Sequence, residues 1–150
     1  MNQPLSTLDL NATLNDWNGL VVRIQGFVAS INAMFAEQNA KRNADMLAKF
    51  PDIATTDYWS ALEIRGGSIR GDWLALDHRS GGSHRNGGQR SIYCFIRLTN
   101  GETKTLGMLT AGDIHKPATF KAPAKHRRGN VHAADFGKSC AGLYGIQYLK

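Results

Sequence analysis

Cysteine is scarce in this sequence, acidic residues vanish from one long stretch, and uninterrupted apolar runs are short. Two cysteines are too few for a disulfide framework, and Cys94 lies in an apolar run, which predicts a buried, reduced thiol. No run approaches the roughly 18 apolar residues of a membrane span. The first ten residues lack the basic and then apolar segments of a signal peptide. We therefore expect a cytoplasmic protein that does not bind membranes.

The positive charge is concentrated in the second half of the chain. The net charge is +6, but residues 1–75 carry six basic residues against eight acidic ones, whereas residues 76–150 carry twelve against four. All five histidines lie in the second half, and no acidic residue occurs between Asp113 and Asp135. Such a distribution attracts polyanions to one part of the surface. The alternative interpretation is that the charge only keeps the protein soluble.

Residues 1–50 predict a helical scaffold with a heptad seam between Leu10 and Phe35. Gly19 and Gly26 occupy outward positions, and Asn18-Gly19 would break the segment into two helices. A further helix from about residue 36 to residue 50 ends at Pro51. The seam either packs on this protein's own sheet or joins copies of the chain in a homo-oligomer. Its members are Leu10, Leu14, Trp17, Val21, Ile24, Val28, Ile31 and Phe35, broadened by Leu20, Phe27 and Met34.

Residues 57–150 predict an antiparallel sheet of about four or five strands, so a single α+β domain over residues 1–150 is expected. The clearest element is a hairpin of Ser91–Thr99 and Glu102–Thr110, joined by an Asn100-Gly101 turn. This register places Arg97 opposite Lys104, and either exposure to water, which we favour, or a nearby anionic ligand would relieve the like-charge contact. Both faces of the hairpin are apolar away from the turn, which is typical of a central position in a sheet.

Two long basic connections, residues 77–90 and 113–132, are the candidate functional segments. The first is rich in glycine and arginine, which let backbone amides and forked side-chain donors approach phosphate. In the second, prolines hold a basic run extended. The alternative interpretation is that both are solvated loops without a ligand. The predicted phosphate contacts are His78, Arg79, His84, Arg85, Arg90, Lys125, His126, Arg127, Arg128 and His132.

These observations favour a small basic protein that binds RNA, another nucleic acid, a nucleotide or another phosphate-rich ligand. One alternative is a metal-independent ribonuclease or related phosphoester enzyme that uses the loop histidines, although no catalytic residue can be assigned. In element order the chain resembles microbial ribonucleases, without a matching motif. Another is a phage- or plasmid-encoded inhibitor of a host protein or nucleoprotein. Arginines beside the histidines oppose a cation, so no metal and no cofactor are expected.

Overall fold

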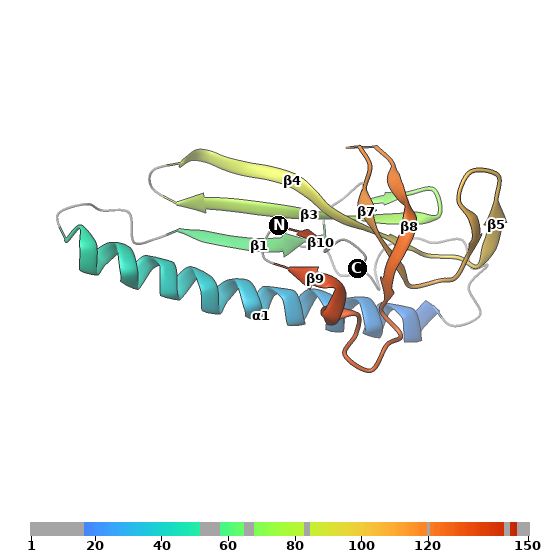
Figure 1. The fold of residues 1–150 in the computed structure, drawn as a ribbon, viewed down its shortest axis with the longest axis horizontal. Helices are drawn as coiled ribbons and strands as arrows, with labels where there is room; N and C mark the ends of the chain where they lie inside the picture. The colour runs from blue at the N-terminus through green and yellow to red at the C-terminus, as the bar shows by residue number, and fades with distance from the viewer. Residues whose placement is uncertain are drawn as a thin grey trace.

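One long helix lies along an antiparallel sheet, which confirms the predicted α+β class (Figure 1). The computed structural model describes residues 17–51, 58–64, 68–82, 85–119, 121–142 and 145–146. The helix α1 spans Trp17–Lys49. The main sheet has six strands, in the order β1-β3-β4-β7-β8 with β2 paired to β3, and two small two-stranded sheets accompany it.

The remaining elements follow α1 in chain order, and the main-sheet pairings are all antiparallel. The small sheets pair β5 with β6 and β9 with β10. The bounds are β1 Trp59–Glu63, β2 Ile69–Arg70, β3 Trp73–Gly82, β4 Arg85–Arg97, β5 Gly101–Thr103, β6 Gly107–Leu109, β7 Asp113–Pro117, β8 Pro123–Asn130, the 3₁₀ helix η2 Lys138–Cys140, β9 Ala141–Gly142 and β10 Gly145–Ile146.

The apolar seam of α1 forms the helical side of the hydrophobic core. Leu20, Ile24, Phe27, Ile31 and Phe35 are all buried against the sheet, so the seam from Leu20 onward packs within the chain. Asn18 and Gly19 lie in the first turn of α1, and the segment before Trp17, which would form the second helix of the predicted break, lies outside the described residues. The predicted helix of residues 36–50 is the continuation of α1, which ends before Pro51 as expected. The seam residues before Trp17 lie outside the described residues.

By length and composition α1 is also a candidate membrane span. Its segment Gly19–Lys49 is the one such helix found in the described part of the chain. A core helix of a globular protein passes the same test, and the apolar residues of α1 from Leu20 to Phe35 are packed on the sheet. We therefore describe α1 as a core helix.

Three asparagines of α1 cover the outer edge of β1. In a paired strand, alternate residues direct their backbone groups away from the neighbouring strand, and here residues 58, 60 and 62 point away from β3. The asparagines are spaced seven and four residues apart, which places them on one face of the helix. Each bonds to one outward-pointing residue. The pairs are Asn32 with Leu62, Asn39 with Ser60 and Asn43 with Tyr58.

The amide of Asn32 satisfies both backbone groups of Leu62. Its Nδ2 donates to the Leu62 carbonyl at 3.3 Å, and its Oδ1 accepts the Leu62 N–H at 2.7 Å. Asn43 makes the same two-point contact with Tyr58, at 2.9 and 3.2 Å. The helix side chains therefore take the place that a further strand would occupy beside β1.

The hairpin predicted around Asn100-Gly101 is wrong in its partners. Gly101 begins β5, which pairs with β6, whereas β4 pairs with β3 on one side and β7 on the other. The predicted central position is confirmed for β4, whereas residues 102–110 contribute to β5 and β6, which form a separate two-stranded sheet. Cys94 is a buried free thiol. Arg97 is buried rather than solvated, and it donates to the Thr99 carbonyl at 2.9 Å and lies 3.7 Å from Asp72. Asn-Gly is a local signal, and it was outweighed by the burial of β4 between two strands.

The two predicted basic loops are mostly strands. Residues 77–90 form the end of β3 and the start of β4, and residues 113–132 contain β7 and β8. The absence of large apolar residues from 77–90 suggested a loop, but the segment is mostly strand, and carboxylates supply partners for Arg79 and Arg90. Both basic segments are therefore held on hairpins of one sheet (Figure 1).

Gly26 faces a packed aromatic ring and not solvent, which corrects its predicted outward position. A Cβ at Gly26 would lie 2.3 Å from a ring carbon of Phe136. Arg23, one turn earlier, stacks on the same ring at 3.9 Å and donates to the carbonyls of Val131 and Ala133. This contact ties the chain after β8 to α1.

Candidate functional site

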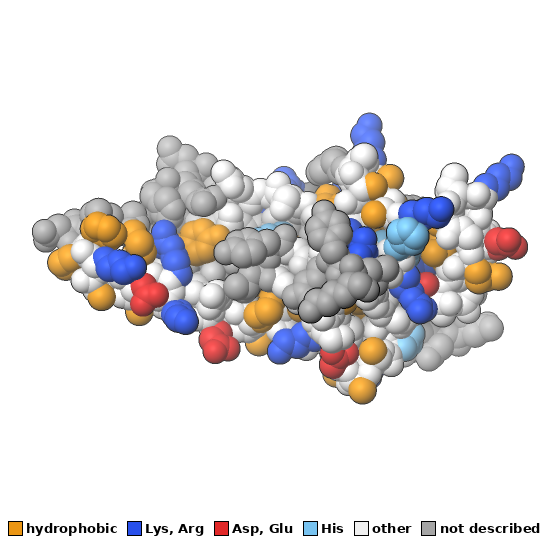
Figure 2. Space-filling view, viewed as in Figure 1, with side chains coloured by type: hydrophobic (Ala, Val, Ile, Leu, Met, Phe, Trp, Pro, Cys, Tyr) orange, Lys and Arg blue, Asp and Glu red, His pale blue; other side chains and the backbone are white. Residues whose placement is uncertain are grey.

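The strongest concentration of exposed positive charge lies on β8, at one edge of the main sheet. Lys125, His126 and Arg127 are all exposed, and β8 is the last strand of the sheet. These three residues lie where the register of β8 against β7 shifts, between the pairs Pro117–Pro123 and His115–Arg127. Figure 2 shows Lys, Arg and His side chains gathered over β7 and β8, whereas acidic and basic side chains are mixed along α1.

A buried carboxylate organises the base of this hairpin. Asp113 is 2 % exposed and accepts hydrogen bonds from the Thr110 N–H at 2.8 Å and from Asn130 Nδ2 at 2.9 Å. Its Oδ1 also lies 3.6 Å from the guanidinium of Arg127, whose side chain is 61 % exposed. Asp113 therefore fixes where β7 and β8 begin to pair and neutralises one of the nearby charges. Lys121 and Lys125 are exposed further along the hairpin.

Two of the three arginines of the first predicted segment have carboxylate partners within the sheet. Arg79 lies 3.4 Å from Glu63, and Arg90 lies 3.7 Å from Asp77. These partners reduce the positive field of residues 77–90 compared with that of β8. The side chain of Arg85 and all of His84 lie outside the described residues.

The two predicted segments share a sheet without forming one continuous basic surface. Strands β4 and β7 pair at Phe95–His115 and Ile96–Ile114, and Arg90 lies five residues, about 16 Å, before Phe95. Figure 1 shows the β3–β4 tip at one end of the molecule, away from β7 and β8. In the second segment, Arg128 is half-buried on β8, and His132 is exposed in the turn that follows.

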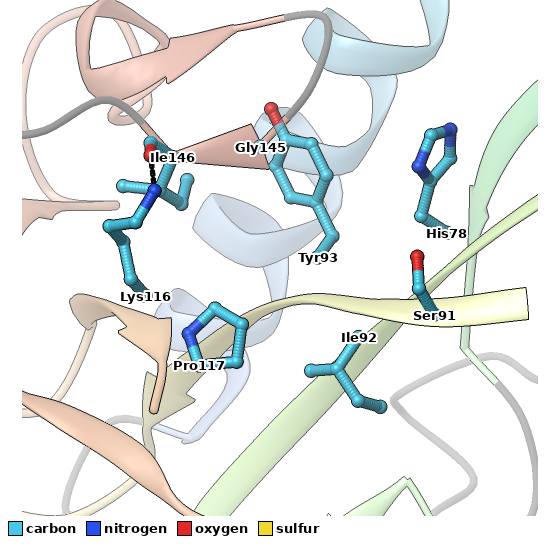
Figure 3. A pocket seen from close by; sticks show the side chains of 8 residues that line it. All are labelled: His78, Ser91, Ile92, Tyr93, Lys116, Pro117, Gly145 and Ile146. Carbon is cyan, nitrogen blue, oxygen red and sulfur yellow. Dashed lines mark hydrogen bonds between the residues drawn. The ribbon is translucent and has the colours of Figure 1, made fainter. Parts of the chain in front are cut away.

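The segments do meet at a cavity of about 260 Å³ between β3, β4, β7 and β10 (Figure 3). His78 comes from the first segment and Lys116 from the second, while Ser91 and Tyr93 belong to β4. The sequence interpretation placed Ser91 and Tyr93 in a hairpin with the wrong partner and therefore missed their part in this cavity. Their only signal was their position in a central strand.

Two of the histidines, His78 and His115, are held neutral inside the fold. Burial lowers the pKa of His78, whose ring stacks on Phe35 with 4.8 Å between centroids. Burial also lowers the pKa of His115, outweighing the hydrogen bond of its Nδ1 to the Ala124 carbonyl at 2.8 Å and the nearby charge of Asp113. His115 packs edge-on against Trp73. His78 faces α1 and His115 faces the opposite side of the sheet, so these two do not form an acid–base pair.

Stability is expected to fall as the pH drops below about 6.5, the ordinary pKa of histidine. The pKa values of His78 and His115 are lower in the folded state, so between the two values the unfolded chain binds protons that the folded chain does not. The slope reaches about 1.4 kcal/mol per pH unit for each such histidine. Urea unfolding at several pH values measures it. His115→Gln should flatten the slope, and the exposed His132→Gln should not; equal slopes in both variants would contradict this assignment.

Within the described residues, no three side chains of His, Cys, Asp or Glu gather in a geometry that would hold a metal ion. The histidines of β8 and of the turn after it are exposed, and no carboxylate is in hydrogen-bond contact with them in the described contacts. We assign no catalytic residue from this arrangement.

Comparison with known proteins adds one finding. Residues 82–145, which run from the end of β3 to β10, match a family described as a family of unknown function, DUF7717. The match covers β4, the β7–β8 hairpin and most of the cavity, but leaves out α1 and β1. No curated protein and no solved structure matches the chain significantly. The chain is thus similar, over fewer than half of its residues, to a family whose function is unknown.

Proposed function

We propose that this protein binds nucleic acid, and that the edge strand β8 with the β7–β8 turn contacts the phosphate backbone. The observation that carries the proposal is the row of exposed Lys125, His126 and Arg127 on an open sheet edge. Lys121 adds a further exposed charge at the turn, and the sequence from residue 114 to residue 134 contains no acidic residue. The second half of the chain would therefore attract a polyanion to this edge.

The geometry of a strand suits this role. Lys125, His126 and Arg127 are consecutive and exposed, and the register of β8 against β7 shifts between Pro123 and Arg127. An extended nucleic-acid backbone lying along the edge would meet three adjacent side chains that can donate to phosphate. Contacts of this kind recognise phosphate and carry little sequence preference.

Charged residues on an edge strand have a second known use, which is to prevent pairing with the edge of another sheet. A binding measurement distinguishes the two explanations, because charges that only prevent edge-to-edge pairing do not require a ligand. A cytoplasmic location, where RNA and DNA are available, belongs to the same proposal. A host protein that binds in place of nucleic acid is an outcome that the following experiment would reveal.

Replacing Lys121 and Lys125 with glutamine is expected to weaken binding of a labelled single-stranded oligonucleotide at every salt concentration. It should also make the plot of log affinity against log salt concentration less steep, by about 0.7 for each charge removed. Fluorescence anisotropy with oligodeoxythymidylate and oligouridylate measures both quantities. The side chains are exposed, so the fold should be unaffected.

The matched control is Lys41→Gln with Lys49→Gln. It removes the same net charge from exposed positions on α1, whose C-terminal end lies far from β8 (Figure 1). If the two double variants lose affinity equally, net charge and not β8 is responsible. If the wild-type protein binds neither oligonucleotide at low salt, the proposed function is wrong.

A further inference from the structure

An exposed tryptophan lies at the start of β1. Trp59 is 40 % exposed, and its Cα partner on β3 is Gly81. A Cβ at Gly81 would lie 2.9 Å from two atoms of the indole ring, so glycine at this position lets the ring lie against β3. The indole is therefore held in place by the sheet, while a large part of it is open to solvent.

Trp59 lies on the face of the sheet that α1 does not cover. Successive side chains of a strand point to opposite faces, and the register of β1 against β3 is regular. Leu62 packs in the core with α1, so Trp59, three residues before it, points to the opposite face. Gly81 and Arg79 share that face with Trp59, because they pair with Trp59 and Ala61.

Two arginines lie beside the indole. The guanidinium of Arg79 is 5.9 Å from the centre of the Trp59 ring, and Arg90 is the Cα partner of Arg79 on β4. Glu63 and Asp77 hold these two guanidinium groups at 3.4 and 3.7 Å, and the arginine side chains are still 32 % and 42 % exposed. A guanidinium carries five N–H donors, so contact with one carboxylate leaves donors for a second anion. Two positioned cations therefore lie next to a positioned aromatic ring.

The strands near the indole are rich in glycine. Positions 81 and 82 of β3 and positions 87 and 88 of β4 are all glycine. Glycine inside a strand packs no side chain on the sheet and often marks a place where a ligand approaches the backbone closely. An aromatic ring and two arginines suit a flat ring that is attached to an anionic group, and a nucleotide has both parts.

We propose that Trp59 stacks on one base of a single-stranded nucleic acid, with an adjacent phosphate at Arg79 and Arg90. This inference rests on the proposed function and adds a second contact to it. The strand must be single because only an unpaired base can stack on a side chain. The edge strand β8 supplies attraction to the phosphate backbone, and Trp59 supplies contact with a base.

The second contact lies far from β8 on the same sheet. Strands β1 and β8 are the first and last of the sheet order, four strand spacings or about 19 Å apart. Along β4, the level of Trp59 is near Gln89, about 20 Å from the pairing of Phe95 with β7. Figure 1 shows the start of β1 beside the β3–β4 tip, away from β7 and β8. The two contacts are thus roughly 28 Å apart, which about eight nucleotides span at 3.4 Å each.

The test compares oligodeoxythymidylate with an oligomer of the same length that has abasic sites throughout, both long enough to span the two contacts. The wild-type protein is expected to bind oligodeoxythymidylate about tenfold more tightly, a gain typical of one stacked base. Trp59→Ala should remove this preference and leave the affinity for the abasic oligomer and the salt dependence unchanged. Trp59→Phe keeps a smaller ring and should keep part of the preference. The control Phe50→Ala removes another exposed ring, after the end of α1, and should keep all of it.

Tryptophan fluorescence gives a second measurement on the wild-type protein, which decides the question even if Trp59→Ala fails to fold. Oligodeoxythymidylate should quench the fluorescence more than the abasic oligomer does, and equal quenching would contradict stacking. Equal affinity of the wild-type protein for the two oligomers, or an undiminished preference in Trp59→Ala, would overturn this inference and leave the proposed function standing. If the wild-type protein binds neither oligomer, the proposed function fails, and the stacking inference fails with it.

Discussion

Replacing Asn32 with alanine is expected to lower the free energy of unfolding by about 2–4 kcal/mol. The change leaves the N–H and the carbonyl of Leu62 without their side-chain partner, and Leu62 is fully buried. Each buried backbone group left unsatisfied costs about 1–3 kcal/mol. Alanine is the better helix former by up to about 0.7 kcal/mol, so helix propensity acts in the opposite direction. Urea unfolding measures the net effect.

Gln38→Ala is the control, because it changes an exposed amide of the same helix. It should leave stability unchanged or raise it slightly. Asn39→Ala should cost less than Asn32→Ala, since Asn39 donates only to the Ser60 carbonyl and pairs with its hydroxyl. If Asn32→Ala is no more destabilising than Gln38→Ala, the covering of β1 by α1 does not contribute to stability.

Gly26→Ala is expected to destabilise the protein by about 1–3 kcal/mol, the usual cost of overpacking. In the interior of an exposed helix the same change stabilises by about 1 kcal/mol, so the sign alone distinguishes the two situations. The added methyl group would lie 2.3–2.9 Å from three ring carbons of Phe136. Thermal or urea unfolding of the variant measures the effect.

A double-mutant cycle with Phe136→Ala tests the cause. Removing the ring makes room for the methyl group, so Gly26→Ala should be neutral or stabilising in that background. If Gly26→Ala costs the same with and without the ring, the close contact with Phe136 is not the source of the destabilisation. If Gly26→Ala stabilises the otherwise unchanged protein, the segment after β8 does not pack on α1 as described.

The helical scaffold could be predicted because its apolar spacing is regular over many residues, and tertiary packing used that same face. The asparagines at positions 32, 39 and 43 share one face of the helix in the sequence too, but their spacing does not indicate what they contact. Only the position of β1 shows that their amides meet backbone groups. Polar residues on one helix face are expected to contact either water or the edge of a strand, and the sequence does not distinguish these two environments.

The sheet was harder to predict because strand partners are chosen by contacts distant in sequence. The central position of residues 91–97 was evident from apolar residues on both faces, but β3 and β7, which flank them, were not. The segment 77–90 has no apolar pattern, and the carboxylate partners of Arg79 and Arg90 are evident only from the structure. Of the candidate site, the basic run on β8 was visible in the sequence, whereas the cavity depends on four strands meeting.

The asparagine cover on β1 has a consequence for how copies of this protein can associate. Strands add to a sheet through free backbone groups at its edges, and a sheet with two free edges can extend without limit. In the main sheet described here, side-chain amides occupy the outer edge of β1, whereas β2, β8 and the part of β4 before Phe95 each pair with a strand on one side only. A strand from another copy could pair with the outer edge of β1 only by displacing the amides of α1. Growth of the sheet by repeated addition therefore cannot use β1, whatever binds to β8.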